Sequence, residues 1–241
     1  ADLPAGIREQ FAKLSLLSQQ YQGLHAASGT LGAGKRGNVR LAFLSIIFKS
    51  VGLPEQYHLA RFVMWLKSQG LLDAVQQYVR LHGKAVADQD PWQRELRNLY
   101  VSPVMAQALL PHFGDLATNA PDMSKVLRAQ FPEVKDITND EMVDAVMDAL
   151  ERNGQLPLTL IVLDEVQQYV GGDEDRAFDV QEVIETCCKA SRFKSRLLFV
   201  ATGQSALSDT PNLQRLMGRF VVTVQLADTD VDAVIRKVIL Q

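Results

Sequence analysis

A short apolar run in the second half of the chain gives the clearest structural signal. Residues 158–163 are apolar except for Thr159, and they lead straight into Asp164 and Glu165. A run this short and this apolar predicts a strand that is buried on both faces of a parallel sheet. The two acids would then lie at the carboxyl end of that strand, the edge where α/β proteins bind their ligands.

A second apolar run follows after a helical stretch. Residues 196–201 predict a neighbouring buried strand, which leads into Thr202 and Gln204. A third strand is expected over residues 221–226.

Helical periodicity prevails elsewhere, above all in the first half of the chain. Proline, glycine and capping residues set several of the expected ends, with Thr138 or Asn139 as the N-cap of one helix and Pro103 as an interruption in another. Strands and helices in this order predict an α/β protein with a large helical part. The expected helices cover residues 7–20, 39–51, 57–69, 73–80, 94–110 (as one or two helices), 124–130, 139–153 and 178–190.

The acids at the end of the first run suggest metal-dependent phosphate chemistry. In P-loop NTPases an acid at this place holds Mg²⁺, directly or through water, and Asp164 is the candidate. The adjacent Glu165 could polarise an attacking water, which completes the Walker B pattern of an ATPase. The plainer alternative is a buried strand that ends in a solvated acidic turn.

The residues after the second run continue this ATPase pattern. In AAA+-like ATPases the strand beside Walker B ends in a polar residue that touches the γ-phosphate or the attacking water, and Thr202 and Gln204 are the candidates. Arg219 precedes the expected third strand, where such proteins carry an arginine that reaches a neighbouring subunit's nucleotide. Arg215 is the second candidate, or it pairs with an acid of its own subunit. Arg219 could instead be a surface residue that packs its stem against Phe220.

A glycine-rich loop near the N-terminus matches part of a phosphate-binding motif. Residues 29–35 (GTLGAGK) fit G-x-x-x-x-G-K, but Arg36 stands where a Ser or Thr would ligate Mg²⁺. The preceding residues 22–28 are only weakly strand-like. The loop could cradle phosphate, or it could be a flexible turn with a solvated Lys35. We predict that Lys35 does not contact phosphate.

Composition narrows the class of protein without identifying it. The chain has 241 residues, 47% of them hydrophobic and 22% charged, as in ordinary globular proteins. The formal net charge of −3 lacks the basic character of a dedicated nucleic-acid module. No apolar run reaches the roughly 20 residues of a membrane span, and the first residues do not resemble a signal peptide. The adjacent Cys187 and Cys188 are poorly placed for a disulfide or a metal site, which fits a reducing, cytoplasmic setting.

Several segments resemble the large BrxC/PglY-type ATPases of bacterial BREX and Pgl phage-defence systems. The resemblance covers nearly the whole chain and is most specific from Walker B to sensor 1. The similar segments are 37–44 (GNVRLAFL), 48–54 (FKSVGLP), 60–66 (ARFVMWL), 99–103 (LYVSP), 162–169 (VLDEVQQY) and 201–207 (ATGQSAL).

This resemblance implies an AAA+-like P-loop NTPase core, built on a parallel sheet, with a large helical insertion. Residues 1–155 would form the mostly helical part, residues 156–228 the part with Walker B, sensor 1 and the arginine finger, and residues 229–241 the start of a helical lid. It also implies ATP and Mg²⁺ as cofactors and an oligomer of identical subunits. Other phage-defence proteins would be partners, DNA is a further candidate, and no membrane is involved.

Those ATPases are much longer, and their Walker A loop precedes the region that is similar here. The chain is therefore expected to be a fragment that binds ATP weakly or not at all by itself. The alternative is a non-catalytic α/β interaction module that keeps an ATPase-like sheet.

Overall fold

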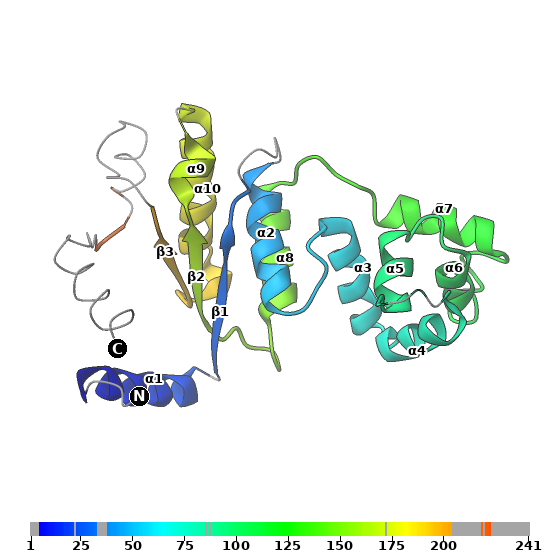
Figure 1. Ribbon diagram of the computed structural model, residues 1–241, viewed down its shortest axis with the longest axis horizontal. Helices are drawn as coiled ribbons and strands as arrows, with labels where there is room; N and C mark the ends of the chain where they lie inside the picture. The colour runs from blue at the N-terminus through cyan, green and yellow to red at the C-terminus, as the bar shows by residue number, and fades with distance from the viewer. Residues whose placement is uncertain are drawn as a thin grey trace.

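The computed structural model is an α/β structure with a small parallel sheet and many helices (Figure 1). It describes residues 5–21, 23–32, 38–84, 86, 88–171, 173–203, 218 and 220–222. The elements run in the order α1 (Ala5–Gln20), β1 (Leu24–Thr30), α2 (Val39–Ser50), α3 (Tyr57–Ser68), α4 (Leu72–His82), α5 (Pro91–Arg97), α6 (Pro103–Leu109), α7 (Ala120–Gln130), α8 (Asn139–Leu150), β2 (Leu158–Asp164), α9 (Val166–Val170), α10 (Glu174–Lys189), a 3-10 turn (Ser191–Phe193) and β3 (Leu197–Ala201).

The sheet has three parallel strands in the order β1-β2-β3, with β2 at its centre. The strands predicted from the two apolar runs are β2 and β3, and their parallel pairing is confirmed. The residues before the glycine-rich loop also form a regular strand, β1, so the expectation of weak strand character there is wrong. Backbone pairing with β2 along the whole of β1 outweighs the low strand propensity of its small residues.

One face of the sheet packs against α2, α8 and α10 and forms the first of two cores. The ring of Phe43 in α2 stacks on Phe199 of β3 with 6.0 Å between centroids. Gly29 lies inside β1, where an added Cβ would come within 3.0 Å of Cγ1 of Ile46 in α2. This glycine therefore allows the close approach of strand and helix. Ile161 and Leu163 of β2 complete this side of the core, and both are almost fully buried.

The helices α3 to α7 form a second core, which lies on the far side of α2 and α8 from the sheet (Figure 1). Phe62 is fully buried there and meets Phe131 edge to face, with 5.5 Å between centroids. Leu53 packs against both cores. The first core draws residues from both sides of position 155, since β1, α2 and α8 precede it while β2, α10 and β3 follow it.

Local sequence signals account for the starts of several helices. Thr138 accepts the backbone N–H of Glu141, whose carboxylate accepts the backbone N–H of Thr138, and this capping box starts α8. Pro103 follows the N-cap Ser102 and begins α6, so the periodic stretch 94–110 is two helices. The helix expected over residues 178–190 begins earlier, at Glu174, because the side chain of Asp173 caps it there.

Arg40 ties α2 to α8 and α10 on the edge of the first core. Its Nε donates to Oδ1 of Asn139 at 2.7 Å, and Nη2 donates to Oε2 of Glu182 at 3.1 Å. Asn139 also donates to the other oxygen of Glu182 at 2.8 Å. Burial of the nearby Asp179 raises the pKa of its carboxyl, an effect that the charge of Arg40 partly offsets.

Among the described residues no helix is both long and apolar enough to cross a membrane.

Candidate functional site

The carboxyl ends of the three strands bring polar residues together at one edge of the sheet. Thr30 at the end of β1 is in register with Asp164 at the end of β2. Leu163 is in register with Ala201, which places Thr202 beside Asp164 on the other side. Asp164, Thr202 and Thr30 are therefore neighbours across the sheet, although Thr30 and Asp164 are 134 positions apart in the sequence (164 − 30).

A small hydrogen-bond network joins Asp164, Glu165 and Thr202. The hydroxyl of Thr202 donates to Oδ1 of Asp164 and accepts the backbone N–H of Glu165 at 3.2 Å. The backbone of Thr202 continues the ladder, because its N–H donates to the carbonyl of Leu163 at 3.0 Å and its carbonyl accepts from Val166 at 3.1 Å. Thr202 is thus held firmly against the two acids.

Glu165 has a left-handed backbone, with φ 52° and ψ 42°, where β2 turns into α9. This conformation costs a residue with a Cβ about 1–2 kcal/mol, and such strain concentrates at functional sites. Asp164 ends the strand with an exposed side chain, and the side chain of Glu165, at the turn, is half-buried.

Replacing Glu165 with glycine should raise the free energy of unfolding by about 0.5–1 kcal/mol, because glycine adopts φ > 0 without a steric cost. The higher conformational entropy of glycine in the unfolded chain offsets part of this stabilisation. Lys194→Gly is the matched control, since Lys194 has φ 50° and ψ 38° far from the acids. Urea denaturation would measure both. A loss of stability in Glu165→Gly alone would mean that contacts of the Glu165 side chain outweigh the backbone strain.

The edge with Asp164 and Thr202 fits the protein side of a magnesium–nucleotide site. Mg²⁺ usually takes one or two carboxylates and completes its shell with phosphate oxygens and water, so a single exposed carboxylate such as Asp164 is a suitable donor. In the part of the chain that the structure describes, no three His, Cys, Asp or Glu side chains gather as they would in an all-protein metal cage.

Three of the predicted site residues, Gln204, Arg215 and Arg219, lie outside the described residues, and so does Lys35. The expected strand over 221–226 also lies mostly outside them, and its first two residues, Val221 and Val222, are exposed and not in a strand. Of the sequence candidates, the structure therefore brings together Asp164, Glu165 and Thr202.

The glycine-rich loop is flanked by the elements that a phosphate loop needs. It follows β1 directly, and α2 begins behind it with Asn38 as N-cap, whose side chain accepts the backbone N–H of Arg40 at 2.8 Å. One of the two arguments against a phosphate loop, the weak strand, is thereby removed. The other argument, the absence of a metal-ligating hydroxyl at Arg36, is unchanged.

Thr30 is a further candidate residue of this site, and the sequence analysis did not identify it. Its place opposite Asp164 follows from the register of β1 on β2, and the weak strand character of residues 22–28 concealed that pairing. The available signal was a hydroxyl residue inside the glycine-rich motif of residues 29–35.

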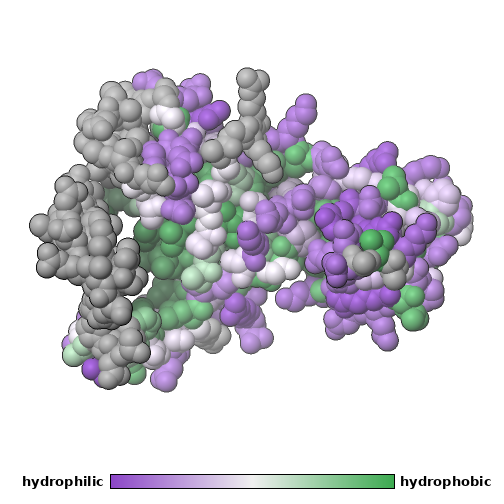
Figure 2. Space-filling view, viewed as in Figure 1, coloured by the Kyte–Doolittle hydropathy of each residue, from purple (hydrophilic) through white to green (hydrophobic). Residues whose placement is uncertain are grey.

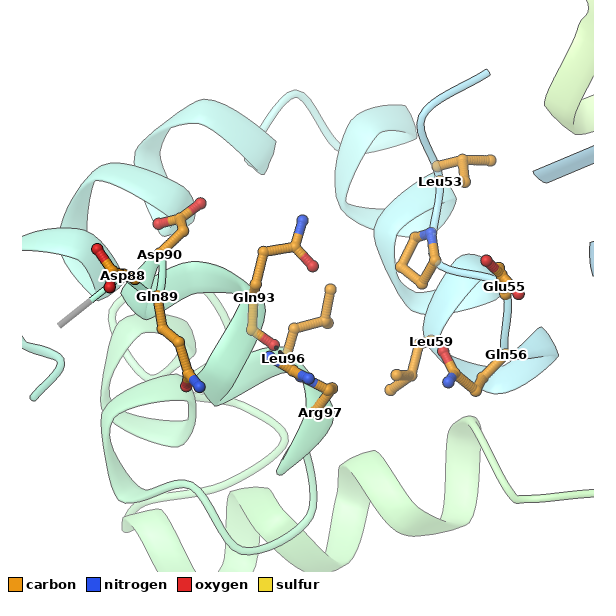
Figure 3. Close-up of a pocket in the computed structure, with 11 residues that line it drawn as sticks. Leu53, Glu55, Gln56, Leu59, Asp88, Gln89, Asp90, Gln93, Leu96 and Arg97 are labelled. Carbon is orange, nitrogen blue, oxygen red and sulfur yellow. Dashed lines mark hydrogen bonds between the residues drawn. The ribbon is translucent and has the colours of Figure 1, made fainter. Parts of the chain in front are cut away.

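A separate pocket of about 550 Å³ lies in the helical part, between the start of α3 and the residues around the start of α5 (Figure 3). Its polar lining is mostly carboxylates and amides, from Glu55, Gln56, Asp88, Gln89 and Gln93. Asp90 is engaged in capping α5 and in an ion pair with Arg80 at 3.3 Å, which together hold the pKa of its carboxyl below its usual range. The pocket has no paired acid and hydroxyl of the kind seen at the sheet edge.

Comparison with known proteins gives no match to this chain among protein-family models, curated proteins or solved structures.

Proposed function

We propose that residues 1–241 carry the metal- and water-binding part of an ATP-hydrolysing P-loop site in an AAA+-like protein. The supporting observation is the network of Asp164, Glu165 and Thr202 at the carboxyl edge of a parallel sheet. An acid that holds the metal and a polar group that orients the attacking water recur beside the phosphate loop in enzymes that transfer a phosphoryl group to water.

Each of the three residues has a distinct role in this proposal. Asp164 would hold Mg²⁺, which when bound neutralises charge on the phosphates. Thr202 would fix the rotamer of Asp164 and lie close to the terminal phosphate. Glu165 would accept a hydrogen bond from the attacking water and orient it.

The resemblance to BrxC/PglY-type ATPases extends the proposal to a biological role. In that role ATP hydrolysis drives assembly or remodelling in bacterial phage defence, in the cytoplasm, within an oligomer and with other defence proteins or DNA as partners. Gln204 would join Thr202 at the phosphate. Arg219, or Arg215, would reach the nucleotide of the neighbouring subunit.

The test is phosphate release from MgATP by the longest natural chain that contains these residues. Asp164→Asn should lower kcat/KM about 10- to 100-fold, the equivalent of one lost charge-assisted interaction, and should raise the Mg²⁺ concentration needed for half-maximal rate. Asp115→Asn is the control, since Asp115 is exposed in the helical part. Equal rates in wild type and Asp164→Asn would favour the non-catalytic interaction module.

A calorimetric titration locates the phosphate loop. If that loop lies outside residues 1–241, this segment alone should bind MgATP weakly or not at all, because loop N–H groups supply most phosphate contacts. Tight binding by the segment, abolished by Lys35→Ala, would assign the phosphate loop to residues 29–35.

A further inference from the structure

The helix that follows Glu165 is too short to be stable by itself. Helix α9 consists of Val166–Val170, a single turn. The first N–H groups and the last carbonyl groups of a helix have no partner inside it, so a turn of this length has almost no internal hydrogen bonds. Isolated helices shorter than about 12–15 residues are marginal in water. The position of Glu165, which is the N-cap of α9, therefore depends on the contacts of α9 with the rest of the chain.

The amino end of α9 is fixed by Thr202. The backbone N–H of Glu165 donates to the hydroxyl of Thr202 at 3.2 Å, and the backbone N–H of Val166 donates to the carbonyl of Thr202 at 3.1 Å. These bonds fix the start of α9 on the neighbouring strand.

The carboxyl end of α9 is held by Arg176 of α10. Two carbonyls in this end of α9 accept backbone N–H groups from the residues that follow, Gly171 at 2.8 Å and Asp173 at 3.0 Å. The carbonyl of Tyr169 accepts instead from Nη1 of Arg176 at 3.0 Å. A cation is also favourable at the carboxyl end of a helix.

Further contacts fix the guanidinium of Arg176 in place. It lies over the ring of Tyr169, with Cζ 5.6 Å from the ring centroid, and Tyr169 is only 5% exposed. Nε of Arg176 is 3.5 Å from Oδ2 of Asp173. The other oxygen of Asp173 accepts the backbone N–H of Arg176 at 3.3 Å. Arg176 is thus anchored to the start of α10 and contacts both the ring and the carbonyl of one residue of α9.

Polar contacts are needed here because α9 lies at a hydrophilic part of the surface. Figure 2 shows mainly hydrophilic side chains where Figure 1 draws α9, and hydrophobic side chains where it draws β2 and β3. Val166, Tyr169 and Val170 hold one side of α9 against the first core. Arg176, whose side chain is 37% exposed, connects α9 to α10 from the solvent side.

We propose that Arg176 is a positioning residue for Glu165. Through the ring and the carbonyl of Tyr169 it holds α9 in the orientation that directs the Glu165 carboxylate to the attacking water. The inference rests on the proposed function, which gives Glu165 its role with that water. Arginine suits this task because its planar guanidinium can stack on a ring while it donates to a carbonyl and pairs with a carboxylate.

A double-mutant cycle tests the proposal, with phosphate release from MgATP by the longest natural chain that contains these residues. Arg176→Met keeps most of the stem and removes the donors. It should lower kcat about tenfold and leave KM within about threefold, because Glu165 acts on water in the transition state. In a Glu165→Gln background the same change should lower kcat less than about twofold, since the group that Arg176 positions is already absent. An equal loss in both backgrounds would overturn the proposal.

Two further variants separate positioning from a loss of charge on α10. Arg176→Lys keeps the charge and one donor, so its kcat should return to within about threefold of wild type. Lys189→Met is the matched control, because Lys189 lies at the opposite end of α10 and forms an ion pair with Glu185 at 2.6 Å. It should leave kcat within about twofold of wild type, as expected for an exposed ion pair. A loss in Lys189→Met as large as that in Arg176→Met would contradict a specific role for Arg176.

Amide hydrogen exchange in the 1–241 chain distinguishes failure of this inference from failure of the proposed function. Arg176→Met should speed exchange of the Val166 and Gln168 amides at least about fivefold, because α9 then opens more often; these amides donate to the carbonyls of Thr202 and Glu165. Faster exchange without any hydrolysis by the wild type would overturn the proposed function, and with it the catalytic role of α9, while supporting the contact. Unchanged exchange would overturn the inference whatever the hydrolysis rates are.

Discussion

Glu165→Gln should lower ATP turnover about 100- to 1,000-fold in the longest natural chain that contains these residues. Removal of a group that positions or deprotonates the attacking water typically costs a factor of this size. The side chain keeps its length, and the backbone hydrogen bond from Glu165 to Thr202 is unaffected by the change. ATP affinity should therefore stay within about threefold of wild type, because only stabilisation of the transition state is lost.

The measurements are kcat from phosphate release and Kd from nucleotide titration. Glu174→Gln is the control for loss of a nearby negative charge, because Glu174 is an exposed residue at the start of α10. If kcat remains at the wild-type value, Glu165 has no part in hydrolysis. If Kd rises together with the fall in kcat, Glu165 acts in binding, and the division of roles between Asp164 and Glu165 needs to be reversed.

The central strand and most helices could be predicted because their signals are local. The run of residues 158–163 is apolar enough to predict a buried strand, and the capping box of α8 lies within four consecutive residues. The first strand, β1, gave no such signal. Its residues are small because Ala27 and Gly29 face α2 at close range, while Ala26 and Ser28 face the other way and are exposed. Its stability as a strand comes from pairing with β2, more than 120 residues further along the chain.

The candidate site also has features that could be predicted from the sequence and features that could not. Asp164 and Thr202 could be named from the sequence, because each directly follows a predicted strand. Their hydrogen bond depends on the register of β2 on β3, and a shift of one residue would turn Thr202 to the other face. The left-handed turn at Glu165 could not be predicted, since glutamate does not favour that conformation and only the surrounding structure imposes it.

Two separate cores imply two separable unfolding transitions, and the chain contains a probe for each. Its two tryptophans, Trp65 and Trp92, both belong to the helical part. Cys187 is buried in the core beside the sheet. Tryptophan fluorescence therefore reports on the helical part, and thiol labelling in a Cys188→Ser background reports on the sheet.

Phe62→Ala should lower the free energy of unfolding of the helical part by about 3–5 kcal/mol, because it leaves a large cavity at a fully buried aromatic position. The denaturant midpoint of tryptophan fluorescence should fall, while that of Cys187 labelling should change little. Phe43→Ala is the matched variant, since Phe43 is equally buried beside the sheet and stacks on Phe199; it should shift the labelling midpoint instead. Equal shifts of both midpoints in either variant would mean that the two cores unfold as one cooperative unit, coupled through Leu53 and the contacts of α3 with α2 and α8.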